Sequence, residues 1–410
     1  MCACSLKNVV RLAAVGQSLL EWDISRASST GLRAIRCLLR SCDAAFTNLE
    51  GCIDTGEPTK ERFFHGVTPE VLDSFSWLGL NLISLANNHA FDSGSSGLLS
   101  TLKESHNRDL VLAGAGHNLQ QASAPAYCTV SDVRVALVAA VSDATWLPDI
   151  AYATDDSERI AARAGVNPLR IDSVRHILPE EEWQTLGTLA DSTGATVRSR
   201  REAACGWHQN DGETTSFFGV GFARGSKHGQ DVVPNPQDYD RFLESIALAR
   251  RKADIVLVSH HDHIWSNAWQ DVLPWKRRLA HDCIDSGAFA FLGHGVPAAS
   301  GIEVYKRRPI LYSLGNFIFQ ETTCAWAMPE VWESYLGVFD IESTDRWSLS
   351  LTPIDLGSTA DPGLPSCRTG GLPQPSTGAR ADQILKMIED LSKPFGTCIE
   401  RCEDTGVIRP

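Results

Sequence analysis

Short apolar runs alternate with amphipathic stretches along most of the chain. Runs typical of buried strands lie at 9–15, 43–51, 80–86, 110–116, 133–141, 253–259 and 288–293. Helical spacing of apolar residues predicts helices at 31–40, 69–78, 97–104, 179–192, 238–251, 275–286 and 379–391. A hairpin is predicted within 301–319, with its turn at 306–309. Strands that alternate with helices favour an α/β fold around mainly buried sheets.

The same pattern divides the chain into three parts. Residues 1–357 carry most of the strand and helix signals and are expected to form one domain, with 151–235 as a less regular, insertion-like region. Residues 358–378 are rich in Pro, Gly and Ser, which predicts a linker. Residues 379–410 are predicted to form a C-terminal helix and a tail that pack on the domain.

Composition narrows the class of protein. A chain of 410 residues with 43% hydrophobic and 21% charged residues can bury a sizeable core. The net charge of −13 argues against a nucleic-acid partner, which requires a basic surface. No apolar run reaches the roughly 18–20 residues of a membrane helix, and the start lacks a signal-peptide layout, so we expect a cytoplasmic protein without membrane contact. The 12 cysteines show no paired spacing and are expected to be reduced.

Polar side chains follow four of the predicted strands. They are Asn48 and Glu50; Asn87, Asn88 and His89; His261, Asp262 and His263; and His294. Because sites in open α/β sheets form at the carboxyl ends of strands, these groups are expected to converge. Residues two apart on an extended segment face the same way, so His261 and His263 are expected to share one site. Imidazole and oxygen donors suit Mn, Fe, Zn or Ni better than Mg or Ca, and a sphere of mainly oxygen donors with waters also permits Ca.

Each of these residues also has an interpretation that needs no metal. Asn87 and Asn88 are common turn residues, and His89 is suited to capping a helix. His294 alone carries little information without its neighbours in the pattern.

Five stretches point to a known family. They are "AFTNLEG" at 45–51, "NLISLANNHAFDSG" at 81–94, "GVNPLR" at 165–170, "VSHHDH" at 258–263 and "GHGVPAASGIEVYKRRPILYSLGNFIF" at 293–319. Together they resemble the CapA family, which is named for a poly-γ-glutamate capsule-synthesis protein. The resemblance implies a metallophosphatase-like layered sandwich of mixed sheets flanked by helices. It also implies a site in which a carboxylate bridges two metals.

The resemblance assigns roles to the matching residues. Glu50 corresponds to the bridging carboxylate, while Asn88, His261 and His294 correspond to further ligands of one metal. His89 corresponds to the acid/base or oxyanion group beside that metal.

Two positions depart from the family pattern. Gln17 stands where the family has an aspartate ligand, and Pro297 stands where it has a second histidine. Both changes affect the same metal, so we predict one firmly bound divalent ion and a second position that is weak or empty. Glu21 or Asp23 is the alternative ligand for that second position.

A weakened two-metal clamp disfavours phosphoester hydrolysis, whereas one Lewis acid suits proton abstraction next to a carboxylate. His89 and His263 are the candidate pair for removing and returning a proton at a Cα atom. Cys52 is a less favoured donor, because free cysteines are usually buried core residues. The chain is similar to the lasso-peptide epimerase branch of the family. That likeness implies a precursor-peptide substrate, its C-terminal residue (tryptophan is a candidate) as the inverted centre, and a peptide-recognition protein as a candidate partner.

Other residues are candidates for substrate or second-site contacts. Gln17, Asn48, Asp262 and Arg62 form this group, and Lys60 or Arg170 offers another cation for a substrate carboxylate. The Trp-rich segment 263–275 fits either an aromatic substrate pocket or ordinary packing.

Three other functions remain open from the sequence. They are a metal-dependent phosphoesterase or other hydrolase, a poly-γ-glutamate-related enzyme, and a non-catalytic peptide-binding protein.

Overall fold

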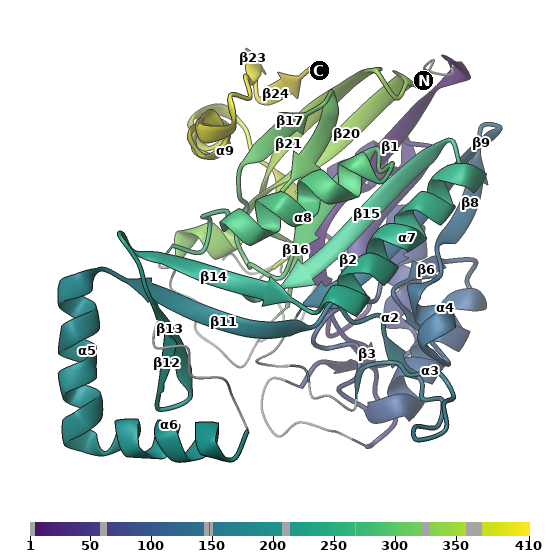
Figure 1. The fold of residues 1–410 in the computed structure, drawn as a ribbon. Helices are drawn as coiled ribbons and strands as arrows, with labels where there is room; N and C mark the ends of the chain where they lie inside the picture. The colour runs from purple at the N-terminus through teal and green to yellow at the C-terminus, as the bar shows by residue number, and fades with distance from the viewer. Residues whose placement is uncertain are drawn as a thin grey trace.

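Two mixed β-sheets pack face to face with helices on their outer sides (Figure 1). The computed structural model describes residues 5–57, 64–142, 147, 151–206, 214–266, 268–320, 328–357 and 371–410. This arrangement confirms the layered α/β sandwich expected from the sequence. Among these residues, no helix combines the length and the apolar character that crossing a membrane requires.

The first sheet has the strand order β23-β24-β21-β20-β1-β2-β5-β6, with β19 beside β1 and β22 beside β21. Its strands are β1 (Ser5–Leu19), β2 (Ala44–Leu49), β5 (Leu82–Ser84), β6 (Val111–Ala113), β19 (Asn316–Phe319), β20 (Glu333–Ser343), β21 (Arg346–Asp355), β22 (Gln374–Pro375), β23 (Glu400–Cys402) and β24 (Thr405–Ile408). The β1, β2, β5 and β6 neighbours are parallel, so their carboxyl ends meet at one edge.

The second sheet has the order β17-β18-β16-β15-β9-β8. Its strands are β8 (Ala126–Val130), β9 (Val133–Ser142), β15 (Ile255–Asp262), β16 (Ala290–His294), β17 (Ile302–Tyr305) and β18 (Arg308–Leu311). The predicted hairpin is confirmed for β17 and β18, whose turn residues Lys306 and Arg307 both have positive φ. The chain then crosses to the first sheet, where β19 pairs in parallel with β1.

Helices cover the outer faces of both sheets. They are α1 (Thr30–Arg40), α2 (Val71–Leu78), α3 (Gly94–His106), α4 (Leu119–Ser123), α7 (Pro236–Lys252), α8 (Pro274–Asp285) and α9 (Gly378–Ser392). The Ser29 hydroxyl caps α1 by accepting the Leu32 N–H, and Asn235 followed by Pro236 starts α7. Helices α7 and α8 pack on the second sheet, while α9 lies against β17, β21 and β24.

Short strands and 3-10 helices lie in the connections between the longer strands and helices. Strand β3 (Cys52–Ile53) pairs with β4 (Gly66–Val67), and β7 (Ala115–Gly116) pairs with β10 (Gly165–Val166). Two 3-10 helices lie at Pro329–Trp332 and Lys393–Phe395. Residues 358–370 of the expected linker lie outside the described residues, and β22 in the rest of it pairs with β21.

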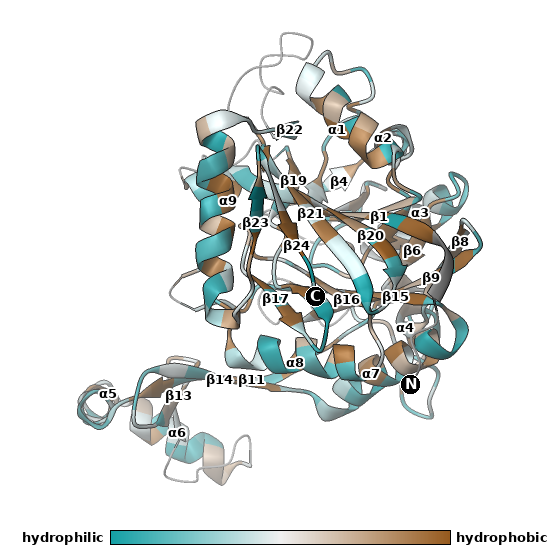
Figure 2. Cartoon of the chain, turned by 90° about the horizontal axis from the view of Figure 1, so that it is seen from above, coloured by the Kyte–Doolittle hydropathy of each residue, from teal (hydrophilic) through white to brown (hydrophobic). Residues whose placement is uncertain are grey.

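Residues 171–206 and 214–234 form an arm that projects from the body (Figures 1 and 2). Its sheet has the order β12-β13-β11-β14, and two helices complete it. The elements are β11 (Ile171–Leu178), α5 (Glu180–Thr193), α6 (Ala195–Ala204), β12 (Thr214–Phe217), β13 (Val220–Arg224) and β14 (Gly229–Pro234). The sequence predicted a less regular, insertion-like region at 151–235 with a helix at 179–192; α5 matches that helix, whereas the strands of the arm were not predicted. These strands are short and mostly half-exposed, so they lack the apolar runs that reveal buried strands.

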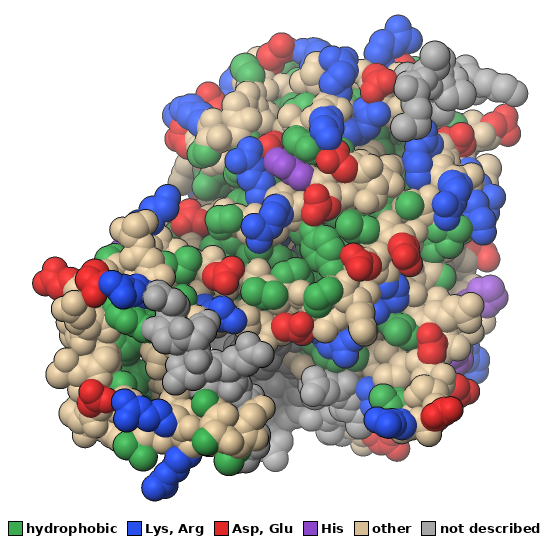
Figure 3. All heavy atoms as spheres, viewed as in Figure 1, with side chains coloured by type: hydrophobic (Ala, Val, Ile, Leu, Met, Phe, Trp, Pro, Cys, Tyr) green, Lys and Arg blue, Asp and Glu red, His purple; other side chains and the backbone are tan. Residues whose placement is uncertain are grey.

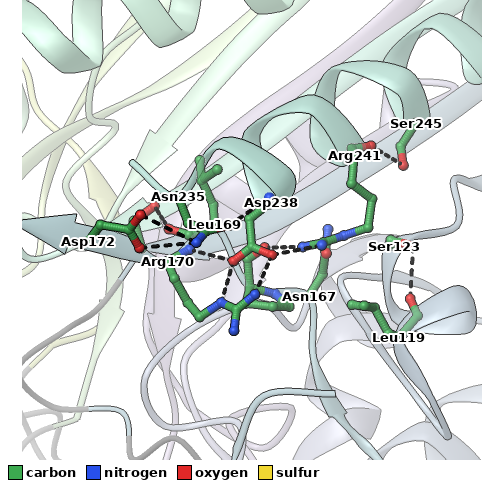
Figure 4. Close-up of polar contacts among 12 residues, drawn as sticks. Leu119, Ser123, Asn167, Leu169, Arg170, Asp172, Asn235, Asp238, Arg241 and Ser245 are labelled. Atoms are coloured by element: carbon green, nitrogen blue, oxygen red, sulfur yellow. Dashed lines mark hydrogen bonds and ion pairs between the residues drawn. The ribbon is translucent and has the colours of Figure 1, made fainter. Parts of the chain in front are cut away.

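Asp238 fixes the base of the arm to α7 (Figure 4). Its carboxylate is fully buried and accepts bonds from Arg170 Nε at 2.6 Å and Arg170 Nη2 at 2.8 Å. Arg241 Nη1 donates to the same carboxylate at 2.7 Å. Burial alone would raise the pKa of Asp238, but the hydrogen bonds from the two guanidinium groups lower it overall. Arg170 therefore serves the fold, which corrects its interpretation as a substrate-carboxylate ligand.

Candidate metal centre

Alternation along β15 sends its histidines to opposite sides of the second sheet. Ile255 and Leu257 belong to the core between the two sheets, whereas Val256 and Val258 belong to the core beneath α7 and α8. Continuing this period of two, His261 lies on the inner side and reaches the first sheet. Its ring and that of His263 lie 5.0 Å apart between centroids, so the structure brings the two histidines into contact.

Glu50 and two histidines form a compact group of donors within the described residues. Donor atoms of Glu50, His261 and His263 all lie within 4.8 Å of one another. Glu50 follows β2, and its Oε1 atom lies 4.0 Å from Nε2 of His261. On the other side of that ring, Asn48 Nδ2 lies 3.5 Å from Nδ1. The sequence-based assignment had placed His263 in catalysis, and this grouping makes it a candidate ligand as well.

His294 lies on β16 directly beside His261, its partner in the parallel register. The His294 ring also contacts Phe46 of β2, with 5.4 Å between centroids, so it too points between the sheets. Burial lowers the pKa of His294 to about 3, and burial also holds the pKa of His261 well below its usual value. Positive charge on His263, His294, His89 or His260 would lower the pKa of His261 further.

This donor set fits a divalent cation. Within the part of the chain that the structure describes, Nε2 of His261 and both ring nitrogens of His294 are buried without a hydrogen-bond partner. Such polar atoms are costly unless something binds them, and neutral imidazole nitrogens are good metal donors. Glu50 supplies the carboxylate, and Asn88 is 4% exposed at the start of the turn that follows β5. The assignment of Glu50, Asn88, His261 and His294 as ligands stays a prediction.

His89 is held by a buried carboxylate that the sequence-based analysis missed. Asp92 is fully buried, and its Oδ2 atom lies 2.7 Å from Nδ1 of His89. The same oxygen accepts the His65 N–H at 2.9 Å, and Asn87 Oδ1 accepts the His89 N–H at 3.0 Å. A carboxylate at Nδ1 fixes the ring and leaves Nε2 to exchange a proton. The spacing of Asp92 three residues after His89 was the available signal.

Gln17 uses its side chain to bridge the two sheets. It is 2% exposed, and its Oε1 atom accepts the Gly295 N–H at 2.9 Å. The family's aspartate position is therefore occupied by a neutral amide with a structural hydrogen bond. Asp23 does not replace it, because its two oxygens accept bonds from Ser25 and Ser74. Pro297 offers only its carbonyl, which accepts a bond from Asn316.

Asp262 points away from the metal donors. It is fully buried on the outer side of β15, where Lys276 Nζ of α8 lies 2.7 Å from Oδ2. His260 lies beside it, with Nδ1 at 3.5 Å, and Ser142 Oγ lies 2.9 Å from His260 Nε2. Asp262 is therefore part of a buried polar network behind the centre, which corrects its interpretation as a second-site or substrate contact.

The remaining candidates differ in their distance from the centre and in whether the structure describes them. Lys60 and Arg62 lie outside the described residues. Cys52 is fully buried, accepts the Ser93 N–H at 3.3 Å, and has a pKa that burial raises to about 12, all of which fits a core residue. Trp265 contacts the His263 ring at 5.6 Å and stacks on Trp269, so part of the Trp-rich segment does lie beside the centre.

Comparison with known proteins places the chain in a family. The model of the bacterial capsule synthesis protein PGA_cap matches residues 11–321. The uncharacterized protein y4sH of Sinorhizobium fredii is 29% identical over 449 residues, spanning 97% of this chain and 92% of its own. The PGA biosynthesis protein CapA of Bacillus subtilis is 33% identical over 143 residues, or 35% of each chain.

Among solved structures, a 5′-nucleotidase precursor from Thermus thermophilus is similar over 89% of this chain and 53% of that one, with 10% identity and a TM-score of 0.34. The family match is the finding with weight, because it extends over more than half of the chain and includes every strand that carries a candidate ligand. This chain is a member of the PGA_cap family of bacterial capsule synthesis proteins.

Proposed function

We propose that this protein is a metal-dependent peptide epimerase that inverts a Cα centre next to a carboxylate. The preferred substrate is the C-terminal residue of a ribosomally made, lasso-type precursor peptide. The observation that supports the proposal is the compact donor group of Glu50, His261 and His263, together with a further imidazole, His89, whose Nδ1 atom lies 2.7 Å from the buried Asp92 carboxylate. Gln17 supports it, because a neutral amide in the second metal position weakens the two-metal clamp of hydrolysis.

A bound divalent cation would supply Lewis-acid stabilisation of the substrate carboxylate and of the charge that develops beside it. His89, oriented by Asp92, would take the α-proton on Nε2 while the C–H electron pair stays with the substrate. His263 would return a proton to the opposite face. After turnover, His89 gives its proton to water and His263 takes one from water, so the reaction needs no further reactant and leaves the peptide mass unchanged.

The test is incubation of synthetic peptides with different C-terminal residues in heavy water. Deuterium at the C-terminal Cα atom without cleavage is expected for the wild-type protein. His89→Ala and His263→Ala should lose this exchange, and His106→Ala, an exposed histidine at the end of α3, is the matched control. Peptide or phosphoester cleavage without exchange would assign the centre to hydrolysis instead, and binding without any reaction would indicate a non-catalytic protein.

Family membership favours one further candidate, an enzyme of poly-γ-glutamate metabolism. The relevant observation is the match to PGA_cap together with the similarity to the Bacillus subtilis PGA biosynthesis protein. Incubation with poly-γ-glutamate, followed by size and chiral analysis of the polymer, separates this candidate from a peptide epimerase.

A further inference from the structure

Strand β15 ends one residue before His263. The last residue of this strand that pairs with a neighbouring strand is Asp262, opposite Ser142 of β9. The sheet therefore does not fix the backbone of His263. Its ring is nevertheless part of the donor group, with a donor atom within 4.8 Å of donors of Glu50 and His261. A ring that is to act at this distance needs a backbone held in one conformation.

An Asx turn spans the position of His263. Asp262 Oδ1 accepts the N–H of Ile264 at 3.1 Å, which closes a turn over the one residue between them. A side-chain bond of this kind mimics a backbone turn and restricts the conformation of the central residue. Because His263 is that central residue, the direction of its ring depends on where the Asp262 carboxylate is held.

Helix α8, which packs on the second sheet (Figure 1), holds this carboxylate from the outer side. Lys276 Nζ lies 2.7 Å from Oδ2 of Asp262, the oxygen that the turn does not use. Both residues are buried, and in the space-filling view of this face hydrophobic and charged side chains cover the region of α7 and α8 (Figure 3). One oxygen of Asp262 is therefore bound to the helix and the other to the turn that contains His263.

Further contacts leave Asp262 little freedom to move. The Ser142 hydroxyl donates to the Leu169 carbonyl at 2.7 Å, so its oxygen accepts the Nε2–H of His260, 2.9 Å away. This arrangement leaves Nδ1 of His260 as an acceptor, 3.5 Å from Oδ2 of Asp262. On the main-chain side, a Cβ atom at Gly295 would lie 2.0 Å from the Asp262 carbonyl oxygen, so the chain after β16 packs directly on this residue. Asp262 is thus fixed through both its backbone and its side chain.

We propose that Asp262 is a positioning residue for His263, and that Lys276 is the residue through which α8 holds it. Both side chains lie on the outer side of β15, and they act on the centre by fixing the turn that carries the His263 ring. The consequence for proton transfer rests on the proposed function. The effect on the ring itself does not, and it is measurable without any reaction.

The test replaces the buried ion pair in two ways that differ in one acceptor. Asp262→Asn with Lys276→Met keeps an oxygen for the Ile264 N–H, and its amide nitrogen can donate to Nδ1 of His260. Asp262→Leu with Lys276→Met has a similar volume but no acceptor, and replacing a buried ion pair by apolar side chains is often neutral for stability. Urea midpoints check the fold of both variants. Asp262→Ala with Lys276→Met replaces the leucine variant if leucine does not fit.

NMR of protein labelled with ¹³C at histidine Cε1 reports on the His263 ring, whose cross-peak is the one that His263→Ala removes. In chelator-treated protein, the asparagine variant should keep this cross-peak at its wild-type position, and the leucine variant should shift or split it. Cα exchange of a peptide in heavy water should stay within about twofold of wild type in the asparagine variant. It should fall about tenfold or more in the leucine variant, as for one lost hydrogen bond.

Two results would overturn the proposal. One is an unchanged His263 cross-peak in the folded variant that lacks the acceptor. The other is an equal change of the cross-peak in both double variants, because the charge pair and not the acceptor would then matter. If the wild-type protein exchanges no Cα hydrogen, the epimerase is refuted, and the His263 cross-peak still decides whether Asp262 positions the ring.

Discussion

Replacing Gln17 by aspartate should restore a second metal position in this protein. The side chain now accepts the Gly295 N–H at 2.9 Å, in a spot where the family pattern has a carboxylate ligand. Aspartate is one methylene shorter, so its oxygens withdraw from Gly295 toward the donors at the ends of β1 and β2. The wild-type protein should bind one divalent ion per chain and Gln17→Asp should bind two.

The stability that Gln17→Asp should lose without metal is similar in size to the stability that a bound cation should return. In metal-free protein, leaving the buried Gly295 N–H without an acceptor should cost about 1–3 kcal/mol of unfolding free energy. A buried carboxylate without a partner adds to that cost. A cation at about 100 times its Kd returns about 2.7 kcal/mol to the folded state. Metal should therefore stabilise Gln17→Asp more than it stabilises the wild type.

The assay combines metal analysis after gel filtration with urea unfolding in the presence of chelator or of Mn²⁺. Gln17→Asn is the matched control, because it has the length of aspartate without its charge. It should show the destabilisation without the second ion. Two tightly bound ions in the wild type, or one ion in all three proteins, would refute this account of the centre.

Four further outcomes are expected. Asp92→Asn should retain metal but lower Cα exchange about 10- to 100-fold, because the buried charge that holds His89 at 2.7 Å is lost; unchanged exchange would exclude a positioning role. His261→Ala should lose metal and His89→Ala should keep it, while metal analysis of His263→Ala decides between ligand and acid/base. Chelator-treated protein should lose stability as the pH falls below about 6.5. Burial lowers the pKa of His294 to about 3 and that of His260 to about 4, so the unfolded chain takes up protons that the folded chain does not. A urea midpoint that stayed constant from about pH 7 to 4.5 would contradict this prediction. Asp238→Ala should lower the unfolding free energy by about 2–3 kcal/mol in a urea titration. The loss is smaller than for a fully buried ion pair because Arg170 is 46% exposed. Asp172→Ala, on the same arm, should change the unfolding free energy little.

The inner strands and their polar ends were predictable because their signals are local. Apolar runs mark β9, β15 and β16, and the period of two along β15 places His261 and His263 on one side. The same period puts Asp262 on the opposite side, so its assignment to the centre was inconsistent with the rule that grouped the histidines.

What the sequence did not reveal depends on contacts between distant residues. Nothing near Arg170 indicates that its guanidinium is held by Asp238, 68 positions along the chain. Lys276 likewise lies on a helix whose pattern gives no hint of a buried ion pair with Asp262. The strands of the arm escaped prediction because half-exposed strands satisfy their backbone hydrogen bonds without a long apolar run.

Because side chains alternate along β15, the pairing register of this strand decides which of its polar side chains face Glu50. A slip by one residue would turn His260 and Asp262 toward Glu50 and would bury His261 and His263 against α8. Parallel pairing with β9 on one side and β16 on the other prevents such a slip over the whole length of β15. A single-residue insertion or deletion between Ile255 and His261 should therefore abolish metal binding even where the sheet still forms.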